Sequence, residues 1–332
     1  MKRIFLFGII AIAGMACANA QQISVVSPGG ETKLYLDLNL AIQEALSGST
    51  IYLSGGGFQI SDNTKITKKL TFMGISHRPD NGNSDGNSTV TGNFFFESGS
   101  DGSAVMGLFV SGNVTIGTAQ NEVNNFLLRY CNVNSVQVGN SKCQGVLINQ
   151  NYIRNSSNGG NSPITFSNNI LHSLSGVTGG TIEHNTILHT LPQGVYELST
   201  SLRHISNATI CNNVIYYLQS ESPNNPPRWS YISNCIIYNN AGTGNLCSIS
   251  VNWSDVFVGP NNGIDISSNF HLRNGAWITD ATDSGEIGIY GGTTGFKDSA
   301  LPPGPRIVSS RIADQTDAAG NLSVEITVSV EQ

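Results

Sequence analysis

Charged residues are scarce in this chain of 332 residues, at 11% of the total, whereas ordinary soluble domains contain about 25%. The formal net charge at pH 7 is −6, and 37 glycines but only 4 methionines and 3 tryptophans are present. A sparse and acidic charge set lacks the basic face that a phosphate backbone requires. The composition therefore argues against nucleic acid as a partner.

Long apolar runs are missing after the first 20 residues, so no transmembrane segment is expected in the remainder of the chain. The beginning differs, because two basic residues precede an apolar run from Ile4 to Ala16, and Ala18-Asn19-Ala20 offers a cleavage site of small residues. This order is typical of a secretory signal peptide. We expect residues 1–20 to be removed and the mature chain to be exported to the periplasm, the cell surface or the extracellular medium.

Closely spaced cysteine pairs are absent as well, which argues against a structural zinc site. An alternative to signal cleavage, lipidation of Cys17, is disfavoured by Gly14, which stands where such signals carry a long aliphatic residue. The cysteines after the signal are odd in number, so at least one thiol is free or bonded to another molecule. We expect them to act as small core residues: Cys131, Cys143, Cys211, Cys235 and Cys247.

One helix is predicted near the start of the mature chain. Leu38, Ala41, Ile42, Ala45 and Leu46 recur at the spacing of a single apolar helical face. Elsewhere glycine and asparagine are abundant, helix formers are scarce and short β-branched runs recur. This composition indicates many short strands joined by tight turns.

An internal repeat of the form apolar-x-x-Asn-x-apolar crosses the middle of the chain. Four copies carry asparagine, at intervals of 18, 16 and 28 residues: Asn151, Asn169, Asn185 and Asn213. Two further copies carry cysteine in the asparagine position, Leu128-x-x-Cys131-x-Val133 and Ile232-x-x-Cys235-x-Ile237. A degraded last copy comprises Ile266, Asn269 and His271. The intervals suit one coil of a solenoid each.

Stacked coils give the asparagines a physical role. Equivalent side chains in a coil of parallel strands lie about 4.8 Å apart along the axis. An asparagine at a bend then hydrogen bonds to the copies above and below it, which satisfies a buried amide. Cysteine cannot continue such a ladder, so the ladder is expected to run through the four asparagines alone.

Several segments carry a family resemblance. They are Ala41-Ile42-Gln43-Glu44-Ala45-Leu46 with the following Ser47 to Leu53, Ile66 to Gly74, Asn269 to Leu272, and Ile287 to Gly292. On these segments the chain resembles secreted right-handed parallel β-helix proteins of the pectin-lyase-like superfamily, particularly those of Bacteroidetes-type bacteria. The resemblance covers nearly all of the mature chain and implies an all-β fold in residues 21–292, a single-stranded right-handed parallel β-helix (solenoid) with an N-terminal capping helix.

The last segment, residues 293–332, holds two strand-like runs, Ile307 to Ile312 and Leu322 to Val330. The second alternates apolar and polar residues, as a half-buried strand does. Because a solenoid needs its open end covered, we expect a C-terminal strand cap. An attachment or sorting tail is the alternative.

The catalytic residues that the resemblance would imply are not recognisable. A pectin-type lyase would carry several acidic residues on adjacent coils to hold calcium, yet the repeats between Leu128 and Ile237 contain only Glu183. The polygalacturonase pattern is also missing, since no Asp-Asp, Asn-Thr-Asp or Gly-His-Gly occurs. The catalytic assignment is therefore unknown, and the long loops supply only weak candidates for an acid, a base or a neutralising cation: Glu197, Arg203, His204 and Arg228.

Polysaccharide is the partner that the resemblance implies. Aromatic planes stack on sugar faces, and arginine or carboxylate side chains bind hydroxyl groups. The alternative is that the aromatic residues only pack the long loops and adjacent coils together. The glycan-binding candidates come from the long loops and from a column three residues after the ladder position: Trp229, Trp253, Tyr216, Tyr238 and Asp255.

A weak calcium-loop pattern is the only cofactor signal. Asn81, Asn83 and Asp85 alternate before Gly86, as oxygen ligands do in such loops. The closing glutamate is replaced by Gly92, and an ordinary polar turn is the alternative.

Three functions remain open at this point. The leading expectation is an exported protein that recognises extracellular polysaccharide without a recognisable catalytic constellation. The alternatives are a polysaccharide lyase or glycoside hydrolase with a loop-built site, and a structural adhesin or surface scaffold. The sequence does not decide whether the protein is an enzyme, nor its oligomeric state.

Overall fold

The computed structural model describes residues 22–78, 86–189, 201–217, 229–241, 248–249, 253–260, 268–273, 275–312, 315, 320 and 324–331. The expected signal peptide lies outside these residues. So do the calcium-loop candidates Asn81, Asn83 and Asp85, and the catalytic candidates Glu197 and Arg228.

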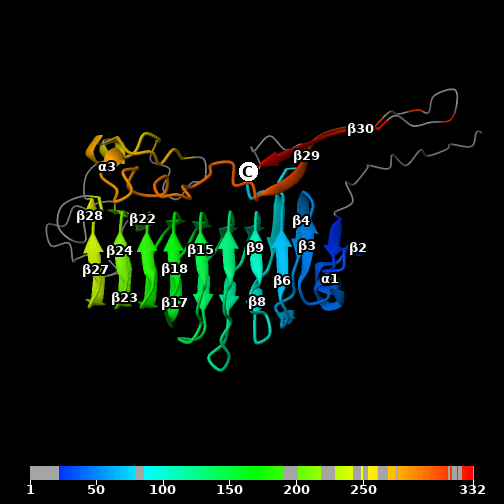
Figure 1. The fold of residues 1–332 in the computed structure, drawn as a ribbon, viewed down its shortest axis with the longest axis horizontal. Coiled ribbons are helices and arrows are strands. Elements are labelled where there is room, and N and C mark those ends of the chain that lie inside the picture. The colour runs from blue at the N-terminus through cyan, green and yellow to red at the C-terminus, as the bar shows by residue number, and fades with distance from the viewer. Residues whose placement is uncertain are drawn as a thin grey trace, which may run out of the picture.

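The fold is an all-β parallel β-helix, as predicted (Figure 1). Successive strands visit three sheets in turn, so every third strand returns to the same sheet one coil further along. Leu128 pairs with Ile148, and Ile148 pairs with Phe166, in parallel and in register. The repeat found in the sequence therefore marks equivalent positions of stacked coils.

The three sheets contain 11, 9 and 8 strands. The first sheet consists of β1 (Ile23–Val26), β2 (Thr32–Tyr35), β3 (Ser49–Leu53), β6 (Leu70–Met73), β9 (Ala104–Met106), β12 (Leu127–Arg129), β15 (Leu147–Asn149), β18 (Thr165–Ser167), β21 (Thr181–Glu183), β24 (Thr209–Cys211) and β27 (Ile236–Tyr238). The second sheet consists of β4 (Gly56–Gln59), β7 (Ser88–Thr91), β10 (Phe109–Val110), β13 (Asn132–Val133), β16 (Tyr152–Ile153), β19 (Ile170–Leu171), β22 (Thr186–His189), β25 (Val214–Tyr217) and β28 (Ser248–Ile249). The third sheet consists of β5 (Lys65–Ile66), β8 (Phe94–Phe96), β11 (Val114–Ile116), β14 (Val136–Val138), β17 (Ser157–Ser162), β20 (Leu174–Thr178), β23 (Leu202–Ser206) and β26 (Trp229–Ser233).

The core lies inside the coils, where one apolar side chain from each strand meets those of the other two sheets. The inward column of the first sheet is fully buried: Ile51, Phe72, Val105, Leu128, Ile148, Phe166, Ile182 and Ile210. Near the N-terminal end four phenylalanines fill the interior, and the rings of Phe96 and Phe126 lie 4.6 Å apart, edge to face. Apolar side chains at a spacing of two residues thus fix the register of every coil.

The predicted N-terminal helix is confirmed as α1 (Leu38–Glu44). Asp37 caps it, because its carboxylate accepts a hydrogen bond from the amide of Leu40 at 2.8 Å. Leu38, Ala41 and Ile42 are buried against the first coil. Leu46 differs from the prediction, since the helix ends at Glu44 and the Leu46 side chain is exposed.

The four asparagines of the repeat form a continuous column of hydrogen bonds at the turn between the first and second sheets. The Oδ1 atom of Asn169 accepts from the backbone amide and the Nδ2 atom of Asn151, at 2.9 and 3.1 Å. Its own Nδ2 atom donates to the carbonyl of Ile148 and to Asn185, and Asn185 is bonded to Asn213 in the same way. Each of these side chains is fully buried.

The ladder extends one coil further than the sequence predicted, because Asn240 accepts from Asn213 at 2.9 Å. The assignment of Cys235 to the ladder position was wrong. In the structure Ile210 pairs with Ile237, so the last copy begins at Ile237 and not at Ile232. Cys131 occupies the predicted position, and its backbone amide donates to Asn151.

Among the described residues, the last strand of a coil is β28, which ends at Ile249. The chain then forms α2 (Trp253–Val256) and α3 (Gly275–Thr279) and runs back over the outer face of the second sheet. Asn269 belongs to this returning chain and not to a coil, since the neighbouring Leu272 forms an antiparallel bridge with Phe257. The apolar cluster beneath it contains Tyr152, Ile170, Leu188, Val214 and Tyr216 from the sheet, and Trp253, Val256, Phe257, Phe270, Leu272, Ile287, Ile289 and Phe296 from the returning chain.

We call residues 280–303 the strap, because they follow the coils in reverse order along the turn between the first and second sheets (Figure 1). In the coils of the asparagine ladder, the residue that precedes the ladder position contacts the strap. These residues adopt left-handed backbone conformations with φ between 50° and 55°. Asn239 donates to the carbonyl of Asp280, Asn212 to Thr282, and Asn168 to the carbonyls of Ile289 and Gly291, while Gln150 accepts from the amide of Lys297.

The predicted C-terminal strand pair forms as β29 (Gly304–Ile312) and β30 (Val324–Glu331), which pair with one another in antiparallel fashion. Near its end the strap contacts the N-terminal coils, where Ser76 donates to the carbonyl of Ser299 and Arg78 to the carbonyl of Asp298. The hairpin follows on this side of the stack, away from the last coil (Figure 1). The hairpin therefore does not cover the end of the solenoid for which a cap was expected.

Replacing Gly291 with alanine should loosen the strap. A Cβ atom at Gly291 would collide with the carbonyl oxygen of Glu286 and with the imidazole of His184, so the strap would have to shift. We expect the free energy of unfolding in urea to fall by about 2 kcal/mol, with faster proteolysis within the strap. Gly275→Ala in α3 is the matched control, since nothing lies within 4 Å of its Cβ position. Equal stability of the two variants would contradict the tight seating of the strap.

Candidate functional site

A column of mostly polar side chains runs along the outer face of the third sheet. One outward side chain from each strand pairs in register with the next, from β5 to β23. At about 4.8 Å per coil, the column is roughly 30 Å long. We call it the outer column, and its members are Lys65, Phe95, Thr115, Gln137, Asn158, Ser175 and Arg203.

A pair of stacked rings stands beside the C-terminal part of the outer column. The rings of His204 and Tyr231 are nearly parallel, with centroids 4.6 Å apart and an interplanar angle of 2°. The guanidinium carbon of Arg203 lies 5.8 Å from the centroid of Tyr231. His204 and Tyr231 both have left-handed backbones, with φ of 51° and 54°, which interrupt the regular alternation of β23 and β26. The result is an exposed aromatic surface next to a cation.

A second ring and cation lie at the N-terminal end of the outer column. The Nζ atom of Lys65 is 3.6 Å from the centroid of Phe95. The hydroxyl and amide side chains of Thr115, Gln137 and Asn158 follow on the next coils. An aromatic ring with a cation at each end and polar groups between them can bind a long polar ligand through both ring stacking and hydrogen bonds.

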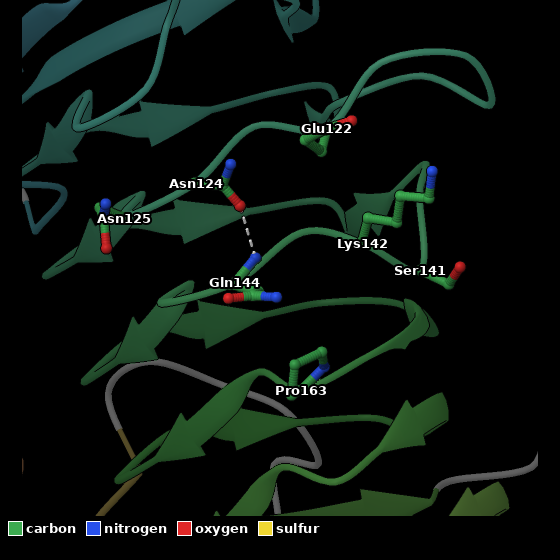
Figure 2. A pocket seen from close by; sticks show the side chains of 7 residues that line it. All are labelled: Glu122, Asn124, Asn125, Ser141, Lys142, Gln144 and Pro163. Carbon is green, nitrogen blue, oxygen red and sulfur yellow. Dashed lines mark hydrogen bonds between the residues drawn. The ribbon is translucent and has the colours of Figure 1, made fainter.

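A polar groove of about 650 Å³ opens where the strands of the third sheet end and the chain turns toward the first sheet (Figure 2). In this groove the backbone amide of Gln144 donates to Oδ1 of Asn124 at 2.8 Å, and this hydrogen bond joins two successive coils. A carboxylate, an ammonium group and several amides line one cavity, so both donors and acceptors for hydroxyl groups are present. The lining residues are Glu122, Asn124, Asn125, Ser141, Lys142, Gln144 and Pro163.

Two of the predicted glycan-binding residues are buried and cannot present a ring to a sugar. Trp253 and Tyr216 pack edge to face with centroids 5.3 Å apart, beneath the returning chain. The indole of Trp253 also donates to the carbonyl of Gly259 at 2.9 Å. Burial raises the pKa of the Tyr216 hydroxyl, and the charge of Asp255 adds to this effect. The packing alternative for Trp253 and Tyr216 is therefore the one that the structure supports.

The remaining predicted residues are spread over different faces. Tyr238 lies on the first sheet, where it pairs with Cys211, and not in the column of Tyr216 as the sequence spacing indicated. Asp255 is exposed on α2, and Trp229 is placed only as a backbone position of β26. Tyr231 was not among the predicted residues. Leu202 and Trp229 pair on neighbouring coils. Because His204 and Tyr231 each follow one of these partners by two residues, they occupy equivalent positions.

Of the four catalytic candidates, only Arg203 and His204 lie within the described residues. Among the described residues, neither Arg203 nor His204 has a carboxylate within hydrogen-bond or ion-pair distance, and no group of three or more His, Cys, Asp or Glu side chains could hold a metal ion. Burial raises the pKa of the Cys131 thiol to about 12, so this cysteine is not a nucleophile. The arrangement on the third sheet is suited to binding.

None of the helices in the described parts of the chain is both long and apolar enough to cross a membrane. No protein-family model matches the chain, and comparisons with curated proteins and with solved structures likewise give no match.

Proposed function

We propose that this protein is exported and recognises an extracellular polysaccharide through the outer face of its third sheet, without chemical conversion of the ligand. The observation that carries the proposal is the outer column, with its regularly spaced polar groups and an aromatic ring near each end. A polymer of repeating units that each present hydroxyl groups and apolar sugar faces fits such a surface. The polar groove beside it supplies further donors and acceptors for branches or for a second chain.

Two further features support this proposal. The sequence resemblance to secreted β-helix proteins of the pectin-lyase-like superfamily in Bacteroidetes-type bacteria makes polysaccharide the natural ligand class. The residues resembling a signal peptide are consistent with a protein that meets such polymers outside the cytoplasm.

The first experiment is incubation of the purified mature protein with a panel of uronate-containing and neutral polysaccharides, with and without calcium. Retention on immobilised polysaccharide reports binding, whereas absorbance of unsaturated products and new reducing ends report chemistry. We expect binding to at least one polysaccharide and no product. Product from any polysaccharide would replace recognition by the lyase or hydrolase alternative, and the absence of both signals would favour a structural adhesin or scaffold.

Removal of the ring pair should weaken binding. Tyr231→Ala, and separately Arg203→Ala, should each raise the Kd about fivefold or more, because stacking and cation contacts with a ligand are each worth about 1 kcal/mol or more. Titration of the preferred polysaccharide by calorimetry measures the change. Tyr52→Ala, which removes an exposed tyrosine from the first sheet, is the matched control and should leave the Kd unchanged. Equal affinities of all these proteins would contradict the placement of the site on the third sheet.

A further inference from the structure

The two ends of the first sheet are open edges. In the described residues β2 pairs only with β1, and β27 pairs only with β24. The unpaired backbone groups of such strands are templates for a further strand. Proteins usually protect such edges with charges or proline, but β27 reads Ile236-Ile237-Tyr238 and contains neither.

The two edge strands run in the same direction. β1 is antiparallel to β3, and β2 is antiparallel to β1, so β2 points the same way as the parallel strands from β3 to β27. When two copies stand end to end on one axis, β2 of the second copy therefore meets β27 of the first as a parallel neighbour. This is the pairing by which the first sheet is built from β3 to β27.

The exposed apolar side chains of the two edges also share a face. Leu34 pairs with Ser24, which pairs with Tyr52, and Tyr52 stands in the outward column of the first sheet. That column passes from coil to coil and ends at Tyr238 on β27. Strand addition in this register places Leu34 of one copy beside Ile236 and Tyr238 of the other, and cross-strand pairs of this kind stabilise sheets.

Both ends expose large apolar side chains. At the N-terminal end Leu34, Leu36 and Leu46 are 61%, 77% and 63% exposed, and at the C-terminal end Ile236 and Tyr238 are 65% and 40% exposed. The interior of the last coil is incompletely covered as well. Ile205 and Ile210 are fully buried, whereas their partners in the last coil, Ile232 and Ile237, are only partly buried.

From these matching edges we propose that the protein associates with a second copy of itself head to tail, with the end formed by β2 and α1 of one copy seated on β27 of the next. The exposed Leu46 beside α1 then covers the partly buried isoleucines of the last coil. Because the two surfaces differ, the contact is heterologous and repeats into a row of molecules.

Sedimentation velocity over a wide range of concentration tests the proposal. The wild-type protein should form dimers and longer species as the concentration rises. Leu34→Lys blocks only the first end and Ile236→Lys only the second, and both side chains are exposed, so each variant should fold. Each variant alone should remain monomeric. An equimolar mixture should form dimers and nothing longer, because one intact pair of ends remains between the two variants.

Other outcomes would overturn head-to-tail association. Wild-type protein that is monomeric at every concentration would show that the edges do not meet. A single variant that still dimerises would show that two copies meet through identical ends. Circular dichroism spectra and thermal melts of the two variants, identical to those of the wild type, ensure that loss of assembly is not loss of folding.

Discussion

Asn169→Ala should lower the free energy of unfolding by about 3 kcal/mol. The Asn169 side chain accepts from the backbone amide and Nδ2 of Asn151, and donates to the carbonyl of Ile148 and to Oδ1 of Asn185. Alanine removes all four hydrogen bonds. The buried backbone amide of Asn151 loses its acceptor and the carbonyl of Ile148 loses a donor, whereas Nδ2 of Asn151 keeps the carbonyl of Leu128 and Oδ1 of Asn185 keeps the backbone amide of residue 169. Each such orphan costs about 1–3 kcal/mol, although partial relaxation of the coils will recover some of the loss.

Urea unfolding measured against two other variants sharpens this result. Asn63→Ala changes an exposed turn residue and should shift stability by less than about 0.5 kcal/mol. Asn169→Asp keeps the acceptor but loses the donor and buries a charge at neutral pH, so it should destabilise more than alanine does. Its stability should recover on acidification, because a protonated carboxyl both donates and accepts. If Asn169→Ala is as stable as Asn63→Ala, the ladder does not stabilise the fold.

Acidification should destabilise the protein through His77. This residue is buried, its Nδ1 atom lies 2.7 Å from the carbonyl of Tyr130, and its Nε2 atom has no hydrogen-bond partner. The pKa of His77 is lowered from 6.5 to about 4, chiefly by burial; the hydrogen bond to Tyr130 opposes this effect, and the charge of Arg78 makes a smaller contribution to the lowering. The native state therefore holds His77 neutral over a range in which the unfolded state binds a proton.

The direction of the pH effect follows from these two pKa values. As the pH falls below about 6.5 the unfolded state gains a proton and the native state does not, so stability decreases until about pH 4, where both states are protonated. The loss over this window is roughly 3 kcal/mol. His77→Gln keeps a donor for the carbonyl of Tyr130 but does not titrate, so its unfolding free energy should depend less on pH by this amount.

Urea unfolding at several pH values provides the measurement for His77→Gln. Asn63→Ala changes an exposed residue that does not titrate, so it is the control and should retain the wild-type pH dependence. Parallel loss of stability in the wild type and in His77→Gln would mean that another group titrates.

The coil repeat could be predicted because its cause is local. Within six residues, the apolar positions on each side of Asn151, Asn169 and Asn185 predict two buried strands joined by a bend. The structure places these three asparagines in one column. The same pattern failed at Cys235, because Ile232-x-x-Cys235-x-Ile237 has apolar residues at both ends, whereas the segment starting at Ile237 has Asn240 in the ladder position but ends on Gly242. Only the pairing with the preceding coil shows which of these two segments holds the ladder position. The loops between coils vary in length, so this register cannot be predicted from the sequence.

The proposed polysaccharide-binding surface on the third sheet was harder to predict than the coil repeat, for a different reason. Trp253 and Tyr231 are both aromatic residues near long loops, yet the first is buried beneath the returning chain and the second is exposed on the third sheet. Exposure here depends on where a segment from the end of the chain lies. The strap has no local sequence pattern either, since its backbone carbonyls accept hydrogen bonds from side chains 41 or more residues away.

The strap affects the order and the cooperativity of folding. In a plain solenoid each coil touches only its neighbours, so folding can start anywhere and the end coils can fray independently. Here the partners are 121 residues apart at Asn168 and Ile289, and 223 apart at Ser76 and Ser299. Such distant contacts form late, because the intervening chain must first be ordered. Folding thus ends with a closure step that ties the early and late coils to one another and makes a modular stack unfold as a single cooperative unit.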